Sequence, residues 1–254
     1  MRRATDRGIV LAVCGGSGSG KTTVARTLAR DLGWVRVDEA YDRLRPRPHL
    51  EPQGQAALRS LELRLLDEEG RRFGAAFEHA DRGRSVVVDT SFLDPVAYTA
   101  GLLVGGEASA PTFRAVVARA RQQIGRGELG LPDLTCYLLT SARTRRRRAS
   151  EDPVRHPERL RDRHERVGRF DASVVRAAFA RGAPGRVRGV RAWRGPTDTA
   201  RSLAAAASNV RPLANPSAAA SRALAALLGD PAIRAAVGGW GNLKKATLSP
   251  RPPR

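Results

Sequence analysis

The sequence has few of the residues that would indicate a secreted or membrane-spanning protein. Its 254 residues include two cysteines, Cys14 and Cys136, and each lies in an apolar stretch typical of a buried strand. Two isolated cysteines in a chain of this length predict free thiols rather than a disulfide framework. No run of 18 apolar residues occurs, and the apolar stretch near the N-terminus is too short for a signal peptide. We therefore expect a soluble cytoplasmic protein without a membrane partner.

Lysine is also scarce. Of the 45 basic residues, only Lys21, Lys244 and Lys245 are lysines, and the others are arginines. The formal net charge of +20 is compatible with a polyanionic partner, such as nucleic acid, an acidic membrane or a phosphate-bearing ligand. Compositional drift in a GC-rich coding sequence is the interpretation that we favour for most of the arginine surplus.

Short apolar runs alternate with segments of helical periodicity along most of the chain. A run without polar alternation predicts a strand that is buried on both faces. The five expected strands cover residues 8–13, 34–38, 85–89, 134–140 and 187–193. The helices expected between and after them cover about residues 22–32, 54–80, 94–103, 113–124, 157–180 and 198–207, with Asp94 and Pro95 suited to a cap and first turn. Strands that alternate with helices predict a three-layer α/β fold with a parallel sheet.

The composition changes after residue 208. Residues 209–237 are rich in alanine, which predicts a short helical extension. Glycine, proline and basic residues dominate from residue 238 to 254, which predicts a disordered basic tail. We therefore expect one domain over residues 1–208, followed by the extension and the tail.

One of the three lysines ends a glycine-rich run, GGSGSGKTT, directly after the first expected strand. Two glycines five residues apart, then Lys21 and Thr22, form the pattern of a phosphate-binding loop when a buried strand precedes it and a helix follows. Glycines let backbone N–H groups converge on a phosphate, and the helix N-terminus adds partial positive charge. Lys21 supplies a compact ammonium for the β- and γ-phosphates, and the Thr22 hydroxyl is a ligand for Mg²⁺. The predicted ATP-binding residues are Gly15, Gly16, Ser17, Gly18, Ser19, Gly20, Lys21, Thr22 and Thr23.

Two further strands end in carboxylates that would complete such a site. Three valines precede Asp89, and the carboxyl end of that strand would lie at the same sheet edge as the loop. We expect Asp89 to hold Mg²⁺ with Thr22, and a turn-capping role for Asp89 is the alternative. Asp38 and Glu39 end the second strand and point to opposite sides of it. Glu39 is the favoured general base for an acceptor hydroxyl. The alternative is that Asp38 or Glu39 forms an ion pair with Arg43 or Arg45.

Five arginines crowd into residues 143–148, shortly after the fourth expected strand. Such side chains repel one another unless anions lie among them, and a transferred phosphoryl group is such an anion. On a helix, Arg143 and Arg147 share one face, and Arg145 and Arg148 share another. We expect two of the five to reach the phosphates, and we assign Arg143 and Arg147 to catalysis. Nucleic acid has less support as a partner, because no aromatic residue interleaves the cluster to stack on bases.

Four motifs make the chain similar to the thymidylate kinase and deoxynucleoside kinase group of phosphate-loop kinases. They are GGSGSGKTT, DEAYDRLRPRP, VVVDTSFLDPVAY and the arginine cluster after LTCYLLT. The resemblance covers about residues 8–208 and implies a P-loop NTPase fold with a five-stranded parallel sheet and a mobile arginine-rich lid from residues 143–148. It implies that Glu39 is the base and that residues 89–91 correspond to an acidic-Arg-Ser element. Thr90 stands where that element has arginine, so the resemblance does not determine the identity of the phosphate acceptor.

The sequence as a whole predicts an ATP-dependent kinase, with Mg²⁺, that acts on a small-molecule acceptor such as a nucleoside, a nucleotide or a similar metabolite. A regulatory ATPase or nucleotide switch that acts on a protein is the second interpretation, and a basic nucleic-acid-binding protein is the third. The oligomeric state, including a homodimer, is left open. Aromatic residues that would line the acceptor pocket, or else pack in the core, are Tyr41, Phe92, Tyr98 and Phe113.

Overall fold

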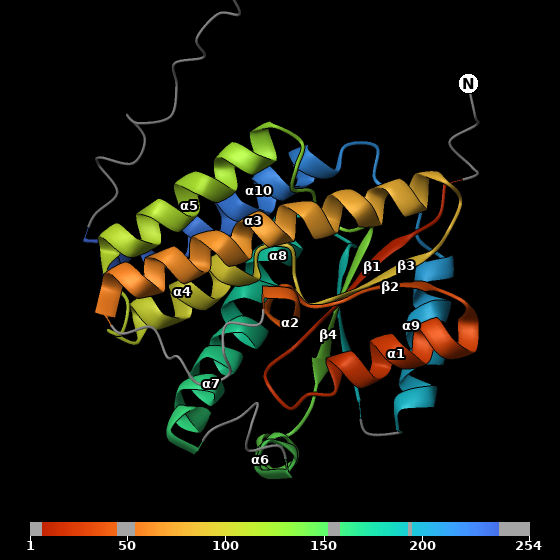
Figure 1. The fold of residues 1–254 in the computed structure, drawn as a ribbon, viewed down its shortest axis with the longest axis horizontal. Coiled ribbons are helices and arrows are strands. Elements are labelled where there is room, and N and C mark those ends of the chain that lie inside the picture. The colour runs from red at the N-terminus through yellow and green to blue at the C-terminus, as the bar shows by residue number, and fades with distance from the viewer. Residues whose placement is uncertain (1–6, 45–53, 152–157, 193–194, 239–254) are drawn as a thin grey trace, which may run out of the picture.

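A five-stranded parallel sheet organises the fold (Figure 1). The computed structural model describes residues 7–44, 54–151, 158–192 and 195–238, so the predicted basic tail lies outside the described residues except for Gly238. The strands are β1 (Val10–Cys14), β2 (Val35–Val37), β3 (Val86–Asp89), β4 (Leu134–Leu139) and β5 (Val187–Arg191). Each expected strand is present, which confirms the predicted α/β class.

The strand order β2-β3-β1-β4-β5 places β1 in the middle of the sheet. Val13 of β1 is paired with Asp89 of β3 on one side and with Cys136 of β4 on the other. All neighbouring strands are parallel, so their carboxyl ends meet at one edge. The segment that follows β1 therefore begins at the centre of that edge, where ligands of open α/β sheets bind.

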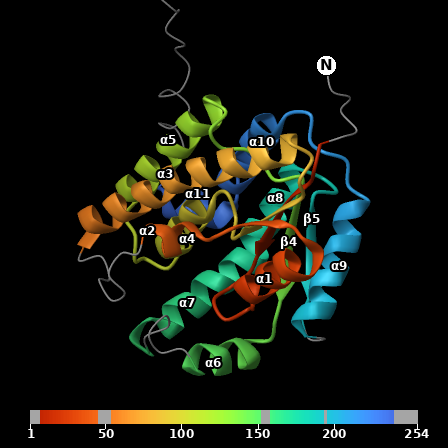
Figure 2. The same ribbon diagram turned by 45° about the vertical axis from the view of Figure 1, so that its right-hand side comes forward.

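Helices cover both faces of the sheet and make three layers (Figures 1 and 2). The first helices are α1 (Lys21–Leu32), α2 (Ala40–Leu44), α3 (Gly54–Asp81), α4 (Asp94–Val104), α5 (Ala110–Gly125) and α6 (Ala142–Glu151). The later helices are α7 (Glu158–Phe170), α8 (Arg176–Gly182), α9 (Pro196–Ser208), α10 (Pro216–Leu228) and α11 (Pro231–Ala236). Helices α1 and α9 pack on the face that carries Leu11 and Val13, whereas α3, α4, α5, α8 and α10 pack on the face that carries Val10, Val86 and Val88.

A π-helical turn interrupts the long helix that the sequence predicts after residue 157. The turn, η1 (Asp171–Val175), joins α7 to α8. π-helical turns inside α-helices are often found at functional sites, because the extra residue changes which side chains face inward. Asp171, the first residue of this turn, faces the cavity described below.

The alanine-rich segment after residue 208 is part of the main core. Helix α10 buries Ala219, Ala223 and Leu227 in the same hydrophobic cluster as α3, α4 and α8. A Cβ atom added at Gly182 would lie 2.4 Å from the Cα atom of Ala223, so the backbones of α8 and α10 are in direct contact. The helical extension is therefore packed as closely as the helices of the preceding domain.

Two further expectations concern cysteines and membranes. Cys14 and Cys136 are free and buried, as predicted, and burial raises the pKa of the Cys136 thiol to about 12. Within the described parts of the chain, no helix combines the length and the apolar character needed to cross a bilayer.

Candidate active site

The glycine-rich run forms a loop between β1 and α1, and we call residues 15–23 the phosphate loop. Gly20 precedes the first residue of α1, so the N-terminus of this helix points into the loop. Gly18 has φ +73°, and a Cβ atom there would lie 2.7 Å from the carbonyl oxygen of Arg145. Both the positive φ and the close approach of α6 require glycine at this position. The local geometry is that of the predicted anion-binding turn.

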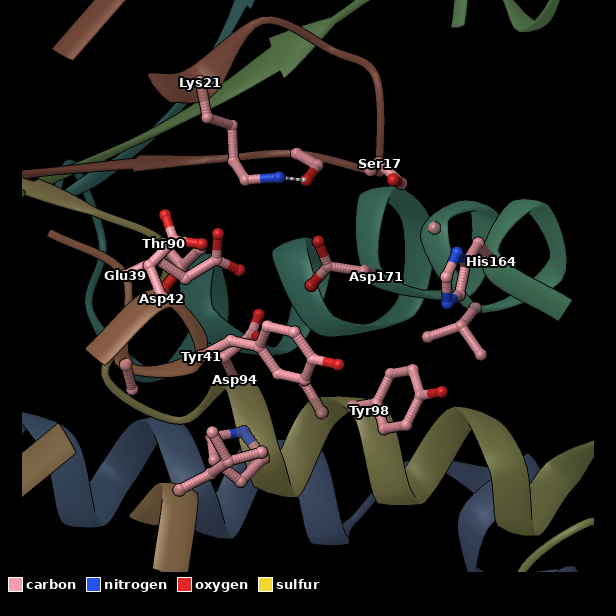
Figure 3. Close-up of a pocket in the computed structure, with 18 of the residues that line it drawn as sticks. Ser17, Lys21, Glu39, Tyr41, Asp42, Thr90, Asp94, Tyr98, His164 and Asp171 are labelled. Atoms are coloured by element: carbon pink, nitrogen blue, oxygen red, sulfur yellow. Dashed lines mark hydrogen bonds between the residues drawn. The ribbon is translucent and has the colours of Figure 1, made fainter. Parts of the chain in front are cut away.

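Lys21 and Thr22 project from the first turn of α1 into a shared cavity. The Nζ atom of Lys21 donates a hydrogen bond to the carbonyl oxygen of Gly15 at 2.8 Å, which holds the ammonium beside the loop (Figure 3). Every predicted residue of the phosphate loop, from Gly15 to Thr23, lines this cavity. The structure thus places together all nine residues that the sequence assigned to ATP.

The cavity extends well beyond the phosphate loop. Its volume is about 1350 Å³, and its walls come from the phosphate loop, α2, α3, α4, α7 and η1. A cavity of this size has room for a nucleotide together with a second small molecule. The loop therefore occupies one end of a much longer binding site.

Glu39 lies at the wall of the cavity, immediately before α2. Figure 3 shows it beside Thr90 and Asp94, on the side of the cavity that faces Lys21. Asp38 also lines the cavity, but it forms an ion pair with Arg36 of β2. Asp38 thus forms an ion pair, but with Arg36, which the sequence did not suggest as a partner, and Arg43 pairs with Glu68 instead.

Asp89 ends β3 beneath the cavity and does not belong to its described lining. The residue is 1% exposed, and neither carboxylate oxygen has a hydrogen-bond partner within the described chain. Arg72 of α3 donates to the backbone carbonyl oxygen of Asp89 at 2.6 Å and forms a buried ion pair with Glu69. The predicted magnesium ligand thus has two unsatisfied oxygens, and its chain neighbour Thr90 reaches the cavity.

These groups fit the chemistry of a magnesium site. Mg²⁺ is bound through one or two protein oxygens, together with water and substrate phosphates. Thr22 supplies a hydroxyl oxygen at the cavity, and Asp89 supplies the unsatisfied buried carboxylate oxygens. Among the described residues no group of three or more His, Cys, Asp or Glu side chains is arranged to hold a metal alone. Such a site would therefore depend on the phosphates as well.

Asp94 and Asp171 are among the carboxylates of the cavity that the sequence does not predict as site residues. Asp94 is the first residue of α4, whose N-cap is Leu93, so Asp94 does not cap the helix as expected. Instead it lines the cavity, where burial raises its pKa and the positive charges of Lys21 and Arg72 oppose that rise. Burial raises the pKa of Asp171 to about 7, and the Asp94 carboxylate contributes to this rise. Figure 3 shows both carboxylates turned toward the space below Lys21.

The arginine cluster forms α6, and a different pair from the one assigned approaches the phosphate loop. The Nη1 atom of Arg148 donates to the carbonyl oxygen of Ser19 at 3.2 Å, and Arg145 lies against Gly16 and Gly18. Arg143 is exposed, and Arg147 is 71% exposed and pairs with Glu151. The assignment of Arg143 and Arg147 is therefore corrected, because α6 turns the face with Arg145 and Arg148 toward the loop.

The four candidate aromatic residues divide into two groups. Tyr41 and Tyr98 line the cavity, and Figure 3 shows their rings beside Asp94 and Asp171. Phe92 and Phe113 are fully buried in the hydrophobic core and do not reach the cavity. The tyrosines thus line the cavity, and their role in binding an acceptor stays a prediction, whereas the core alternative is confirmed for the phenylalanines.

Several solved structures share this fold. Deoxyadenosine kinase from M. mycoides, with products dCMP and dCDP bound, superposes with a TM-score of 0.57 at 12% identity, over 78% of this chain and 97% of that chain. Thymidylate kinase from Candida albicans gives a TM-score of 0.55 at 13% identity, over 78% and 90% of the two chains. The NadR protein in complex with NR gives a TM-score of 0.57 at 17% identity, over 83% of this chain and 54% of that chain. At these identities the similarity establishes the fold.

A family model places the chain more directly. No curated protein matches the sequence. The model described as AAA domain matches residues 10–177, from the first residue of β1 into α8, and so contains the phosphate loop and most of the cavity wall. Because this match covers more than half of the sequence, the chain belongs to the AAA domain family, with the P-loop fold that it shares with nucleoside and nucleotide kinases.

Proposed function

We propose that this protein is a kinase that transfers the γ-phosphate of ATP to a hydroxyl group of a small molecule. One observation carries the proposal: the phosphate loop and the carboxylates Glu39, Asp94 and Asp171 line the same cavity. The loop end offers backbone N–H groups and an ammonium for a triphosphate. The space below Lys21 offers proton acceptors and tyrosine rings for a second ligand. A donor and an acceptor bound in this way would meet inside one cavity.

In the proposed reaction, the acceptor hydroxyl attacks the γ-phosphorus in line with the bond to ADP. A new O–P bond forms, the bond from the γ-phosphorus to the β–γ bridging oxygen breaks, and ADP leaves with that oxygen. Glu39 accepts the hydroxyl proton, because it follows β2 at the sheet edge and faces the Lys21 side of the cavity. Lys21 and Arg148 offset the negative charge on the transferred group.

Magnesium, when bound with ATP, would offset the negative charge of the phosphates. Thr22 and Asp89 are the residues of this chain that would hold it, directly or through water. Arg72 positions Asp89 by fixing the backbone carbonyl group at the end of β3. Asp94 and Asp171 would then face the acceptor rather than the metal.

The test is release of ADP from Mg·ATP in the presence of a panel of hydroxyl compounds, with product identification by mass spectrometry. Lys21→Ala should lower turnover by roughly 10²–10³-fold, because it removes a preorganised positive charge from the transferred phosphate. Circular dichroism should show the same fold for this variant. If the wild-type protein binds ATP but phosphorylates none of the compounds, the kinase proposal is wrong. Hydrolysis that only a protein partner stimulates would support the regulatory ATPase instead.

Glu39→Gln tests the base, and Asp38→Asn is its matched control. Glu39→Gln should lower kcat while leaving ATP affinity unchanged, because it removes the proton acceptor and not a phosphate contact. Asp38→Asn removes a carboxylate one residue earlier that is already paired with Arg36, so kcat should change little. Equal kcat values for the wild type and Glu39→Gln would exclude Glu39 as the base.

A further inference from the structure

The part of the cavity below Lys21 is unusually acidic. We call it the acceptor end, and we define it by Glu62 of α3, Asp94 of α4 and Asp171 of η1, all of which line the cavity. The Asp94 carboxylate lies close enough to raise the pKa of both other groups. Three different elements thus direct carboxylates toward one space, in a protein whose formal net charge is +20.

The cationic side chains of the cavity are engaged elsewhere. Arg163 pairs with Glu107, Arg43 pairs with Glu68, and Arg36 pairs with Asp38. Lys21 and Arg148 hold carbonyl oxygens of the phosphate loop, and Arg26 is exposed on α1. Arg72 is committed to Glu69 and to the Asp89 carbonyl oxygen. Within the described residues, no ion pair joins an arginine or a lysine to Glu62, Asp94 or Asp171. The charge of Lys21 nevertheless opposes the rise in the pKa of Asp94 and of Asp171, whereas no positive charge opposes that of Glu62.

Glu62 is the strongest indication of a ligand. It is 2% exposed, it lines the cavity, and its Oε2 atom has no hydrogen-bond partner in the described chain. Buried polar atoms in proteins are nearly always hydrogen-bonded, so the unpartnered Oε2 atom indicates that a hydrogen-bond donor is missing here. Burial raises the pKa of Glu62, and the nearby Asp94 carboxylate raises it further. A positively charged donor between Glu62 and Asp94 would satisfy both groups and relieve their repulsion.

The remaining walls indicate the shape of such a ligand. Tyr41 and Tyr98 present aromatic rings at the cavity, and aromatic faces attract organic cations and stack on flat rings. The aliphatic residues beside them are Leu58, Leu61, Leu65, Leu102 and Val167. A bare metal ion would make no use of these apolar and aromatic walls, whereas an organic molecule would.

We propose that the phosphate acceptor is an organic cation that bears a hydroxyl group, with its positive charge held by Glu62 and Asp94 and its body against Tyr41 and Tyr98. The inference rests on the proposed kinase activity and names the class of its substrate. The hydroxyl oxygen forms the new bond to the γ-phosphorus, ADP leaves, and the proton passes to Glu39. We expect nucleoside monophosphates to be poor acceptors, because ionised carboxylates at the acceptor end would repel their phosphate group.

Matched compounds that differ mainly in charge test this assignment. One set is adenosine, 1-methyladenosine and adenosine monophosphate, which are neutral, cationic and anionic forms of one scaffold. A second set is glucose, glucosamine and glucuronate. ADP release with Mg·ATP gives kcat/KM for each compound, and the melting temperature reports binding independently. The cationic member of at least one set should exceed its neutral partner by about thirtyfold or more in kcat/KM, and the anionic member should be the poorest.

Glu62→Gln keeps the shape of the side chain and removes its charge. It should reduce the cationic-to-neutral ratio of kcat/KM at least tenfold while ATP affinity stays unchanged, and Asp94→Asn should act in the same direction. Glu78→Gln, on an exposed part of the same helix, is the control and should leave the ratio unaltered. Because the readout is a ratio, a partly unfolded preparation does not distort it.

The outcomes separate this inference from the kinase proposal. ADP release without preference for the cationic members, or with an unchanged ratio in Glu62→Gln, overturns the cationic acceptor and leaves the kinase standing. ADP release from none of these or any other hydroxyl compounds, with ATP bound, overturns the kinase proposal and this inference with it. A cationic preference that Glu62→Gln abolishes supports both.

Discussion

Arg148 of α6 donates a hydrogen bond to the carbonyl oxygen of Ser19, with 3.2 Å between Nη1 and the oxygen. A second contact, 3.4 Å to the carbonyl oxygen of Gly18, places the same guanidinium over the centre of the phosphate loop. Helix α6 and the phosphate loop are thus joined at the point where the triphosphate would lie. Because of this contact, we assign Arg148 rather than Arg143 and Arg147 to the phosphates. Arg147, on the same helix, allows a direct comparison.

Arg148→Ala should lower kcat by about 10²-fold, because a positive group beside the transferred phosphate acts mainly on the transition state. Arg147→Ala is the matched control. It removes the same charge from the adjacent position, but Arg147 is exposed and paired with Glu151. Its kcat should stay within about twofold of the wild type by the same reasoning, since exposed ion pairs contribute little. Steady-state ADP release measures kcat for both variants. A larger loss of kcat for Arg147→Ala than for Arg148→Ala would contradict the assignment of Arg148 to the phosphates.

Gly18→Ala should weaken ATP binding about tenfold or more, because it combines positive-φ strain with a contact to α6. Gly33 provides the control, since its φ of +67° is close to the +73° of Gly18, while a Cβ atom at Gly33 would meet nothing within 4 Å. Both alanine variants should lose about 1 kcal/mol of stability from backbone strain. Only Gly18→Ala should show the altered ATP affinity in isothermal titration calorimetry. Equal affinities would show that α6 tolerates a side chain at Gly18.

Asp171 should make the protein less stable as the pH rises. Burial raises the pKa of its carboxyl from the ordinary 3.8 to about 7, so the folded state retains a proton that the unfolded state has lost. The resulting stabilisation is complete below about pH 4 and disappears as the pH passes through about 7. Between pH 5 and 8, the free energy of unfolding measured with urea should therefore fall more for the wild type than for Asp171→Asn, by of order 1 kcal/mol. The full shift in the pKa of Asp171 would correspond to ~4 kcal/mol of stability. We expect less, because the cavity is open to solvent, which screens the charge. Parallel declines would contradict this prediction.

The sequence predicts the parts of the site that follow directly from strands. Each buried strand is a continuous apolar run, and the residues after such a run meet at one sheet edge, which is why the phosphate loop and Glu39 were found. Glu62, Asp94 and Asp171 lie on helices or a π-turn, where an acidic residue resembles any solvated one in the sequence. Their burial depends on how α3, α4 and η1 pack around the cavity. The orientation of α6 likewise depends on its contact with Gly18, and the sequence of α6 itself does not predict this contact.

The extent of the folded unit was also beyond the sequence. An alanine-rich helix has little apolar surface per residue, so residues 209–237 were interpreted as an extension. Its burial depends on Gly182, a residue more than thirty positions earlier that lets α8 approach α10 at backbone distance. Small residues on both helices make this contact, and small residues carry no hydrophobic pattern that the sequence alone would reveal.

Gly182→Ala should therefore destabilise the protein by about 1–3 kcal/mol, because the added methyl group meets the backbone of Ala223, and a helix backbone moves aside only at a cost. Gly74→Ala is the control within another helix, where a Cβ atom would have nothing within 4 Å. Replacing a helical glycine by alanine in open space stabilises the fold by up to about 1 kcal/mol. The two variants should thus shift the melting temperature in opposite directions, by about 2–4 °C for each kcal/mol. If Gly182→Ala melts at or above the wild-type temperature, α10 is not held against α8 as the structure places it, and the extension is separable from the core.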